Sequence, residues 1–399
     1  MPRRPARASR PVIRPAERTL DIQPFFVMEI LARAQALEAQ GRDIVHMEVG
    51  EPDFPTPEPI VRAAQAALAG GHTRYTPALG LPALRRAIAD YYGKRFGVAV
   101  APDRVVVTPG SSVALQLVVA ALVDPGDEVL LCDPGYPCNR HVVRLAEGRS
   151  VALPVGPENA FQPTPAEVSA AWTGRTRALL LASPSNPTGT VVGPDGLREL
   201  HHAVRSRGGC LIVDEIYQEL AYESEPHTAL ALEGDDLFVV NSFSKYFGMT
   251  GWRVGWIVAP PGLVGTLDRL AQNLYIAAPT VAQHAAVAAF APETIATLEQ
   301  RRRLFGERRD WLVPALGRLG FGVAARPAGA FYVYADCSAF TGDSFDLAGR
   351  LLEEVGVAVT PGADFGANQP KRHLRFAYTT GLDRLQEGVR RIGRFLGVG

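Results

Sequence analysis

Cysteine is scarce in this sequence, neither sign of charge predominates, and no long hydrophobic run is present. The four cysteines among 399 residues form no Cys-x-x-Cys pair, so we expect reduced thiols and neither a disulfide framework nor a metal site. Lys and Arg total 41 and are balanced by 41 Asp and Glu, which leaves no basic field to recruit nucleic acid or a membrane. With no bilayer-length apolar run and no apolar signal segment, the chain is predicted to be a globular cytoplasmic protein.

Residues 1–18 differ in composition from the rest of the chain. They contain six arginines and four prolines and almost no acidic residue. Such a segment buries little apolar surface, so we predict a flexible arm. A transit peptide is the alternative, because those segments are also rich in arginine and poor in acid.

The length predicts two domains. Within residues 57–299, continuous apolar strands alternate with helices, which indicates a mostly parallel sheet covered on both faces. The predicted strands are Val105–Val107, Glu128–Leu131, Ala178–Ala182, Cys210–Val213, Leu237–Val240 and Val254–Ala259. Residues 300–399 mix helices with short strands, and we assign them with residues 19–56 to a smaller α+β domain. The predicted fold class is therefore α/β.

The most informative segment is Ser242-Phe243-Ser244-Lys245, which directly follows an apolar strand. Two hydroxyls precede Lys245, and Arg253 follows it after a glycine-rich turn. An amine in these surroundings suits covalent capture of an aldehyde beside a bound phosphate. Pyridoxal phosphate carries both groups and is held in proteins through a lysine Schiff base. Taken alone, Lys245 is equally explained as a solvated loop lysine.

Two other predicted strands end in residues suited to the same cofactor. Gly110, Ser111 and Ser112 lie between a strand and a helix, where free backbone amides form an anion site. Tyr136 follows the next strand between two prolines and could stack on a flat ring. A helix N-cap and a packed surface tyrosine are the structural explanations of these residues.

Polar side chains follow two further strands. Asn186 precedes a proline in a tight turn, where its amide could contact a ligand oxygen. Asp214 ends an apolar strand, where a carboxylate is costly to bury unless it is paired, and a protonated pyridine nitrogen is such a partner. Tyr217 could reach the phenolic oxygen of that ring. Turn chemistry and helix capping also account for these residues individually, but open α/β sheets bind ligands at such strand ends.

The order and spacing of these motifs resemble the class I and II pyridoxal-phosphate aminotransferases, which have fold type I. The most specific matches are Asn186-Pro187-Thr188-Gly189, Asp214-x-x-Tyr217 and Ser242-x-Ser244-Lys245. The segments Gly50–Phe54, Arg74–Gly80 and His373–Ala377 are also similar to the family. The resemblance covers nearly the whole chain, from about Gln23 onward.

The resemblance implies a role for each motif residue. Lys245 would bind pyridoxal 5′-phosphate and move the substrate proton, Asp214 would hold the pyridinium, and Tyr136 would stack on the ring. Asn186 and Tyr217 would contact the phenolic oxygen. The substrate carboxylate would lie near Gly50 and Asn186, with Arg375 forming a bidentate contact. The phosphate would be held by Gly110, Ser111, Ser112, Ser242, Ser244 and Arg253. The resemblance also implies a homodimer with shared active sites, in which Tyr75 of each subunit reaches the phosphate of the other.

The same resemblance bears on the substrates, an amino acid and a 2-oxo acid that exchange an amino group by a ping-pong mechanism. Bacterial relatives that select a distal carboxylate can carry a lysine where this chain has Ser112. In other relatives an arginine of the partner chain binds that carboxylate, near the segment that corresponds to residues 272–275, which hold no arginine here. We therefore predict a neutral aliphatic or aromatic donor in a pocket that includes Phe26, Tyr75 and Tyr275. Glutamate or 2-oxoglutarate stays open as the second partner.

Two other functions fit part of this pattern. The same scaffold hosts C–S lyases, decarboxylases and cyclopropane-forming synthases, and the residues around Lys245 do not separate them from transaminases. A non-enzymatic ligand-sensing domain behind a winged helix is a further alternative. Only about twenty residues precede the fold here, which is too few for such a DNA-binding module.

Overall fold

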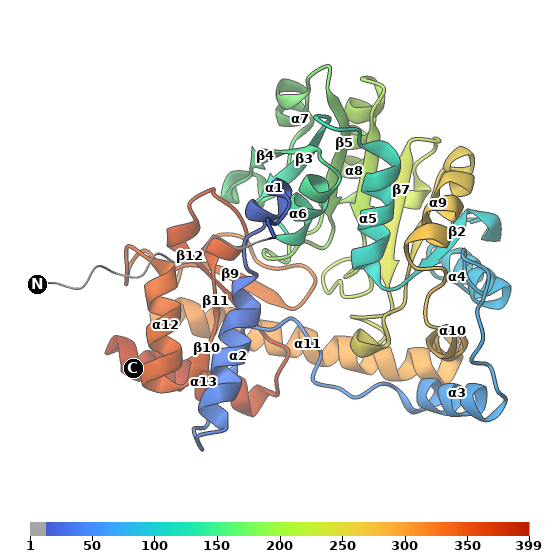
Figure 1. Ribbon diagram of the computed structural model, residues 1–399. Helices are drawn as coiled ribbons and strands as arrows, with labels where there is room; N and C mark the ends of the chain where they lie inside the picture. Colours follow the sequence, from blue (N-terminus) through green and yellow to red (C-terminus); the bar gives the residue numbers. More distant parts are fainter. Residues whose placement is uncertain (1–12, 399) are drawn as a thin grey trace, which may run out of the picture.

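The computed structural model describes residues 13–398, which surround a seven-stranded sheet (Figure 1). Six strands point the same way, and only β8 is antiparallel to its neighbours. In sheet order the strands are β2 (Val105–Thr108), β8 (Gly255–Val258), β7 (Leu237–Ser242), β6 (Cys210–Asp214), β5 (Thr176–Ala182), β3 (Glu128–Asp133) and β4 (Arg149–Pro154).

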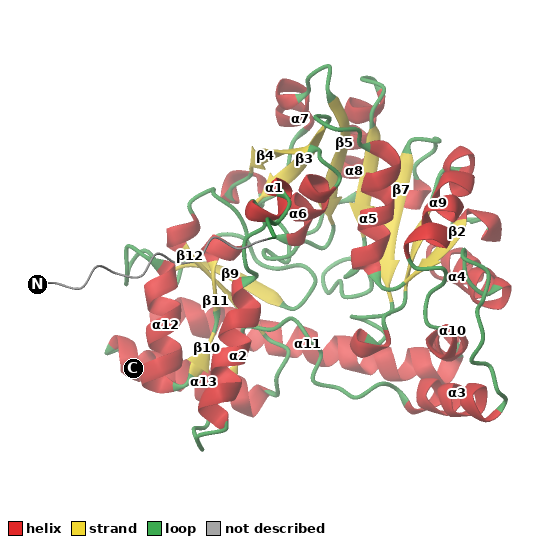
Figure 2. Ribbon diagram, viewed as in Figure 1, coloured by secondary structure: helices red, strands yellow, loops and turns green. Residues whose placement is uncertain are grey.

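Helices cover both faces of this sheet (Figure 2). Successive strand residues alternate between two hydrophobic clusters, as Ile212 and Val213 of β6 do, because neighbouring side chains of a strand point to opposite faces. One cluster holds side chains of α5 (Ser111–Leu122), α6 (Cys138–Leu145) and α9 (Pro261–Leu274). The other holds side chains of α4 (Pro82–Phe96), α7 (Pro165–Ala171) and α8 (Pro194–Arg205). Burial on both faces explains why these strands are continuously apolar.

A second group of elements combines the two ends of the described chain. Antiparallel strands form the order β11 (Thr360–Pro361), β12 (His373–Ala377) and β9 (Tyr332–Asp336). The short β1 (Val45–His46) pairs in parallel with β10 (Val357–Ala358). The helices of this group are α2 (Phe26–Glu38), α12 (Ser344–Val355) and α13 (Leu382–Leu396).

The long helix α11 (Pro292–Leu319) extends beneath both groups of elements (Figure 1). One part of it packs against α3 (Glu58–Ala69), and another packs against α13. The remaining helix on the α3 side is α10 (Thr280–Val287). Among the helices of residues 13–398, none has the length and apolar composition that crossing a bilayer requires.

Most predicted elements are present, with two differences. The strand β4 was not predicted, because it lies at the sheet edge and four of its six residues are exposed. The sequence also predicts a strand-like region from residue 323 to 335 around Pro327–Gly329. Only its end forms a strand, β9, because Pro327 lacks a backbone N–H and a turn at residues 330–331 precedes the strand.

The domain limits at residues 18, 56 and 299 stay predictions. Residues 1–12 of the proposed arm lie outside the described residues. The last residues of that arm begin α1 (Glu17–Leu20), and the Arg18 guanidinium lies 3.2 Å from the Glu147 carboxylate.

Candidate active site

A cavity of about 250 Å³ lies at the carboxyl ends of β5, β6 and β7. Parallel strands place the residues that follow them at one edge of a sheet, which is why distant motifs meet here. The cavity brings together eight of the predicted site residues. They are Gly50, Ser111, Tyr136, Asn186, Asp214, Tyr217, Lys245 and Arg375.

Lys245 and Asp214 are the two ionisable groups at the centre of this cavity. The Lys245 Nζ donates a hydrogen bond to the Gly50 carbonyl oxygen at 2.7 Å. Burial lowers the pKa of Lys245 to about 8, because a desolvated ammonium is costly. Burial likewise raises the pKa of Asp214 to about 7, although one carboxylate oxygen accepts the Ile216 N–H at 3.1 Å. Both groups therefore favour their neutral forms more than exposed groups do.

Beside Lys245, residues from two loops and a helix start form a cradle for an anion. Gly110 adopts φ 81°, and a Cβ at this position would lie 2.4 Å from the Arg253 Nη2. Ser111 then begins α5, whose first backbone amides are free to bind an anion. The hydroxyls of Ser242 and Ser244 lie 2.8 Å apart. A positive φ and the close guanidinium explain why glycine occupies position 110.

Arg375 lies on β12, where only 2% of the residue is exposed. Its Nη1 donates to the Asn186 Oδ1 at 2.8 Å, and its Nη2 donates to the Glu48 carbonyl oxygen. The guanidinium lies 4.3 Å from the ring centre of Tyr332 and 4.8 Å from that of Phe365. Its buried Nε has no hydrogen-bond partner among the described residues. A buried guanidinium with neutral neighbours is suited to binding a carboxylate.

Tyrosine side chains form much of the remaining wall. Tyr136 lines the cavity, and the ring of Phe25 packs edge-on against it with centroids 6.3 Å apart. The Tyr217 and Tyr332 hydroxyls are 2.8 Å apart. A Cβ at Gly50 would lie only 1.7 Å from the Tyr332 hydroxyl, so a side chain at position 50 would displace that tyrosine.

Several predicted residues do not line this cavity. Ser112 is exposed on α5, and Tyr75 is 82% exposed. The Phe26 ring packs against Phe345 with centroids 5.3 Å apart. Tyr275 packs against the core that α9 covers. In this chain alone, the predicted aromatic pocket of Phe26, Tyr75 and Tyr275 is therefore not assembled.

The structure also places residues in the cavity that sequence reasoning missed. Phe25, Ile216 and Tyr332 line it. Phe25 and Tyr332 belong to no motif described above, and Ile216 occupies an unspecified position of Asp214-x-x-Tyr217. Asp364 accepts the backbone N–H groups of Phe26 and Val27 at 3.1 and 3.3 Å. These bonds fix the start of α2, so Phe25 rather than Phe26 faces the cavity.

The donor set fits pyridoxal 5′-phosphate. An amine with a lowered pKa can bind the aldehyde, and the cradle beside Arg253 can hold the phosphate. The buried Asp214 carboxylate, which has no salt bridge within residues 13–398, can pair with the pyridinium. The family model described as "Aminotransferase class I and II" matches residues 42–392. The chain belongs to this family. It is a transaminase that uses pyridoxal 5′-phosphate, and its fold is the fold type I predicted above.

Similar proteins support this assignment along almost the whole length. The valine–pyruvate aminotransferase of Mycobacterium tuberculosis is 40% identical, with 94% of this chain and 97% of that protein covered. The aspartate/prephenate aminotransferase of Thermus thermophilus is 37% identical over 96% of this chain and 98% of its own length. A crystal structure of an aminotransferase from M. tuberculosis has a TM-score of 0.93 at 39% identity, covering 97% of this chain and all of that one.

Proposed function

We propose that this aminotransferase moves an amino group between a neutral L-amino acid, aliphatic or aromatic, and a 2-oxo acid by a ping-pong mechanism. The observation that carries the proposal is the scarcity of cations in the catalytic cavity. Of the described residues that line it, only Lys245 and Arg375 are cationic. Arg375 is suited to the substrate's α-carboxylate and Lys245 to the cofactor, which leaves no cation there for a second carboxylate.

The character of the cavity wall supports the same substrate class. Phe25, Val27, Met28 and Ile216 contribute apolar surface, and the acidic Glu51 also lines the cavity. Apolar side chains gain free energy on entering such surroundings, whereas a carboxylate would lose hydration without a partner. The relative from M. tuberculosis named a valine–pyruvate aminotransferase is consistent with a neutral donor.

In the proposed reaction, the residues of the site act on the substrate and on the cofactor. When bound, pyridoxal phosphate supplies an aldehyde and an electron-accepting ring. Arg375 and Asn186 bind the substrate carboxylate, and this contact orients the Cα–H bond toward Lys245. The Lys245 Nζ, neutral in a substantial fraction near pH 8, removes that proton and later returns one. Asp214 would hold the pyridinium of the bound cofactor, and Tyr136 would stack on its ring.

The remaining contacts of the cofactor would follow the predicted assignments. Asn186 and Tyr217 would contact the phenolic oxygen. The phosphate group would be held by Gly110, Ser111, Ser112, Ser242, Ser244 and Arg253.

A homodimer in the cytoplasm completes the proposal. Tyr75 is 82% exposed, and Leu68, Leu274 and Ile276 are also largely exposed apolar residues. Large apolar side chains are unfavourable in water, so these residues suit a subunit interface. Through it, the partner's Tyr75 would reach the phosphate.

The experiment is a panel of single amino acids added to purified enzyme without any oxo acid. Neutral donors such as valine or phenylalanine should convert the cofactor absorbance band faster than aspartate. Exclusive conversion by aspartate would contradict the neutral-donor assignment. Pyruvate released from a cysteine conjugate, with the original band persisting, would favour a C–S lyase instead.

Lys245 can be tested in the same preparation. The chain contains three lysines, Lys94, Lys245 and Lys371, so borohydride fixation of the cofactor followed by peptide mapping identifies the reacting one. We expect the label on Lys245 alone and its loss in Lys245→Ala. A label retained in that variant would refute the role of Lys245.

A further inference from the structure

A second cavity of about 360 Å³ lies beside the catalytic one, and the predicted functional residues do not account for it. It has a mouth of its own, because several of its lining residues are exposed to solvent beside the edge strand β4. These exposed residues are Gln23, Ser150, Ala152 and Ala367. A ligand can therefore enter from solvent without passing through the catalytic cavity.

The inner wall of the second cavity is largely apolar. The buried strands β3 and β5 contribute Leu131, Leu180 and Leu181, and Phe365 adds an aromatic ring. An apolar ligand gains free energy by leaving water for such a wall. Binding sites for small molecules commonly combine a wall of this kind with a few polar groups that fix the orientation of the ligand.

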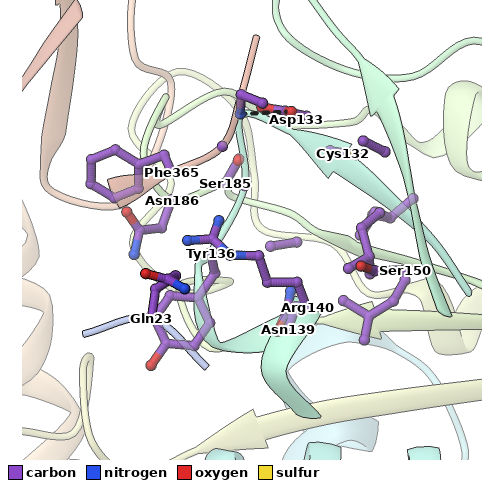
Figure 3. Close-up of a pocket in the computed structure, with 18 residues that line it drawn as sticks. Gln23, Cys132, Asp133, Tyr136, Asn139, Arg140, Ser150, Ser185, Asn186 and Phe365 are labelled. Atoms are coloured by element: carbon purple, nitrogen blue, oxygen red, sulfur yellow. Dashed lines mark hydrogen bonds between the residues drawn. The ribbon is translucent and has the colours of Figure 1, made fainter. Parts of the chain in front are cut away.

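Arg140 on α6 is the one cation among the described residues that line this cavity. Figure 3 shows its side chain extending into the space toward Asn186, above the Tyr136 ring and near Gln23. Its Nη2 donates to the backbone oxygen of Asp364 at 3.2 Å. Within residues 13–398 this guanidinium forms no ion pair, so its charge is not neutralised by direct contact.

The acidic groups near Arg140 are already occupied by backbone donors. The Asp133 carboxylate lines the cavity and accepts the N–H groups of Ala367 and Asn368 at 2.9 and 3.2 Å. The Asp364 carboxylate accepts the two N–H groups that begin α2, as described above. Among the described lining residues, the cavity thus offers a positive charge to an anion but no unpaired acid to an ammonium group. This balance favours a carboxylate over an amino acid.

Asn139 provides an independent indication of a ligand. It is 7% exposed and lines the cavity, yet its buried Oδ1 has no hydrogen-bond partner among the described residues. Buried amides are normally paired, and an unpaired one needs an explanation. The two ends of a primary amide have the same shape, so a half-turn of this group would present the Nδ2 donor to a bound carboxylate.

We propose that the second cavity is an effector site for an apolar monocarboxylate, an aliphatic or aryl-substituted acid without an amino group, which binds while substrate occupies the catalytic cavity. The carboxylate lies against the Arg140 guanidinium and the Asn139 amide, and the apolar body of the ligand packs on β3, β5 and Phe365. A single cation suits a single negative charge, since a second carboxylate would lose hydration without a partner.

The ligand acts on catalysis through the wall that the two cavities share. Tyr136, Ala182 and Asn186 line both cavities. Tyr136 is the proposed stacking partner of the cofactor, and Asn186 accepts a hydrogen bond from Arg375 at 2.8 Å. A ligand packed against both residues from the outer side shifts groups that the reaction uses, so kcat falls. Arg375 stays available to substrate, so a higher substrate concentration does not reverse the effect.

The test uses phenylbutanoate, which has neither an amino nor an oxo group, and phenylbutanamide as its uncharged match. Each is added to holoenzyme with donor and acceptor both saturating, so that substrate displaces any probe from the catalytic cavity. We expect the acid to lower kcat and the amide to require a concentration about tenfold higher or more, because it lacks the charge-assisted contact.

Variants of α6 assign the effect to this cavity. In Arg140→Gln the affinity for phenylbutanoate should fall about tenfold or more, and Asn139→Asp should have a similar effect because it adds a negative charge at the same place. Arg144 lies one turn further along α6, paired with Asp21 at 2.6 Å. Arg144→Gln is therefore the matched control and should keep the wild-type affinity.

Inhibition that disappears at saturating substrate would overturn the effector site, because the probe would then bind only at Arg375. Equal affinity in Arg140→Gln and wild-type enzyme would also overturn it. Calorimetric titration of holoenzyme with phenylbutanoate measures the same binding without turnover, so its result does not depend on the proposed donor class. Cofactor absorbance and Tm establish that each variant is folded.

Discussion

At the level of single residues, burial moves the pKa values of Lys245 and Asp214 toward one another. The pKa of Lys245 falls to about 8 and the pKa of Asp214 rises to about 7, because each side chain loses hydration in the same cavity. A lysine with this pKa combines nucleophilicity with a substantial neutral fraction near physiological pH. The Asp214 carboxylate gains most from a cation placed against it, and a protonated pyridine ring supplies one. The two shifts thus favour the cofactor that the family uses.

The lowered pKa of Lys245 predicts how cofactor binding depends on pH. Only the neutral amine attacks the aldehyde, so the rate of covalent loading of cofactor-free enzyme should rise about tenfold per unit below pH 8. Above about pH 9 the rate should be constant. Stopped-flow absorbance after mixing with pyridoxal phosphate measures it, with N-acetyl-lysine methylamide as the unburied reference. A rate that still increases through pH 10 would show that the pKa of Lys245 is not lowered.

At the level of secondary structure, the anion cradle depends on how α5 begins. Gly110 lies between β2 and α5 with φ 81° and ψ 168°, a conformation that is essentially restricted to glycine. The missing side chain also leaves room for Arg253, which lies between β7 and β8 in the chain, and β8 is the strand that pairs with β2. Sheet order therefore brings the two halves of the cradle together.

Gly110→Ala should weaken pyridoxal phosphate binding about tenfold or more. The new methyl group would lie within 2.4 Å of the Arg253 guanidinium and would force a strained backbone worth about 1–3 kcal/mol. Gly93→Ala is the control, because Gly93 lies inside α4 and a methyl group added there would meet no atom within 4 Å. That change should leave binding intact and raise stability by about 0.5–1 kcal/mol. Cofactor affinity is measured by equilibrium titration. Equal affinity in both variants would exclude a role of the Gly110–Arg253 cradle in binding the phosphate.

At the level of the whole molecule, the site draws on both groups of elements. Lys245 and Asp214 lie at the ends of strands of the large sheet, whereas Arg375 lies on β12 of the smaller one. The Gly50 carbonyl, which accepts from Lys245, follows β1. Relative movement of the two groups would therefore change the distance between the cofactor residues and the carboxylate-binding residue. Tyr75 is exposed on this subunit, and its proposed contact is with the cofactor phosphate in the active site of the partner.

Shared active sites predict complementation between two inactive variants. Lys245→Ala lacks the essential amine, and Tyr75→Ala lacks the proposed phosphate contact. In a mixed dimer, one site combines an intact Lys245 with the partner's Tyr75, so that site should have wild-type kcat/KM. Activity should rise when the subunits are mixed and allowed to exchange. If mixing gives only the average of the two parents, Tyr75 acts within its own subunit or not at all.

Residues at the ends of buried strands could be predicted from the sequence. Asp214 and Lys245 stand at the ends of continuous apolar runs, and such runs identify strands whatever surrounds them. The direction of β8 could not be predicted, because burial on both faces gives the same apolar pattern in either orientation. Likewise, Phe25 and Phe26 are adjacent and chemically identical. Only the bonds from Asp364 to the start of α2 decide which ring faces the cavity.

The sequence by itself determined the strands, the helices between them and the acid, amide and lysine at the strand ends, because these depend on local periodicity and short motifs. The tertiary structure decided how those ends combine with residues far away in the chain. Arg140 belongs to no motif, and its arginine neighbour Arg144 is indistinguishable from it in the sequence. The packing of α6 against the sheet directs Arg140 into a cavity and leaves Arg144 paired with Asp21. Such placement depends on contacts between distant segments, which no local pattern encodes.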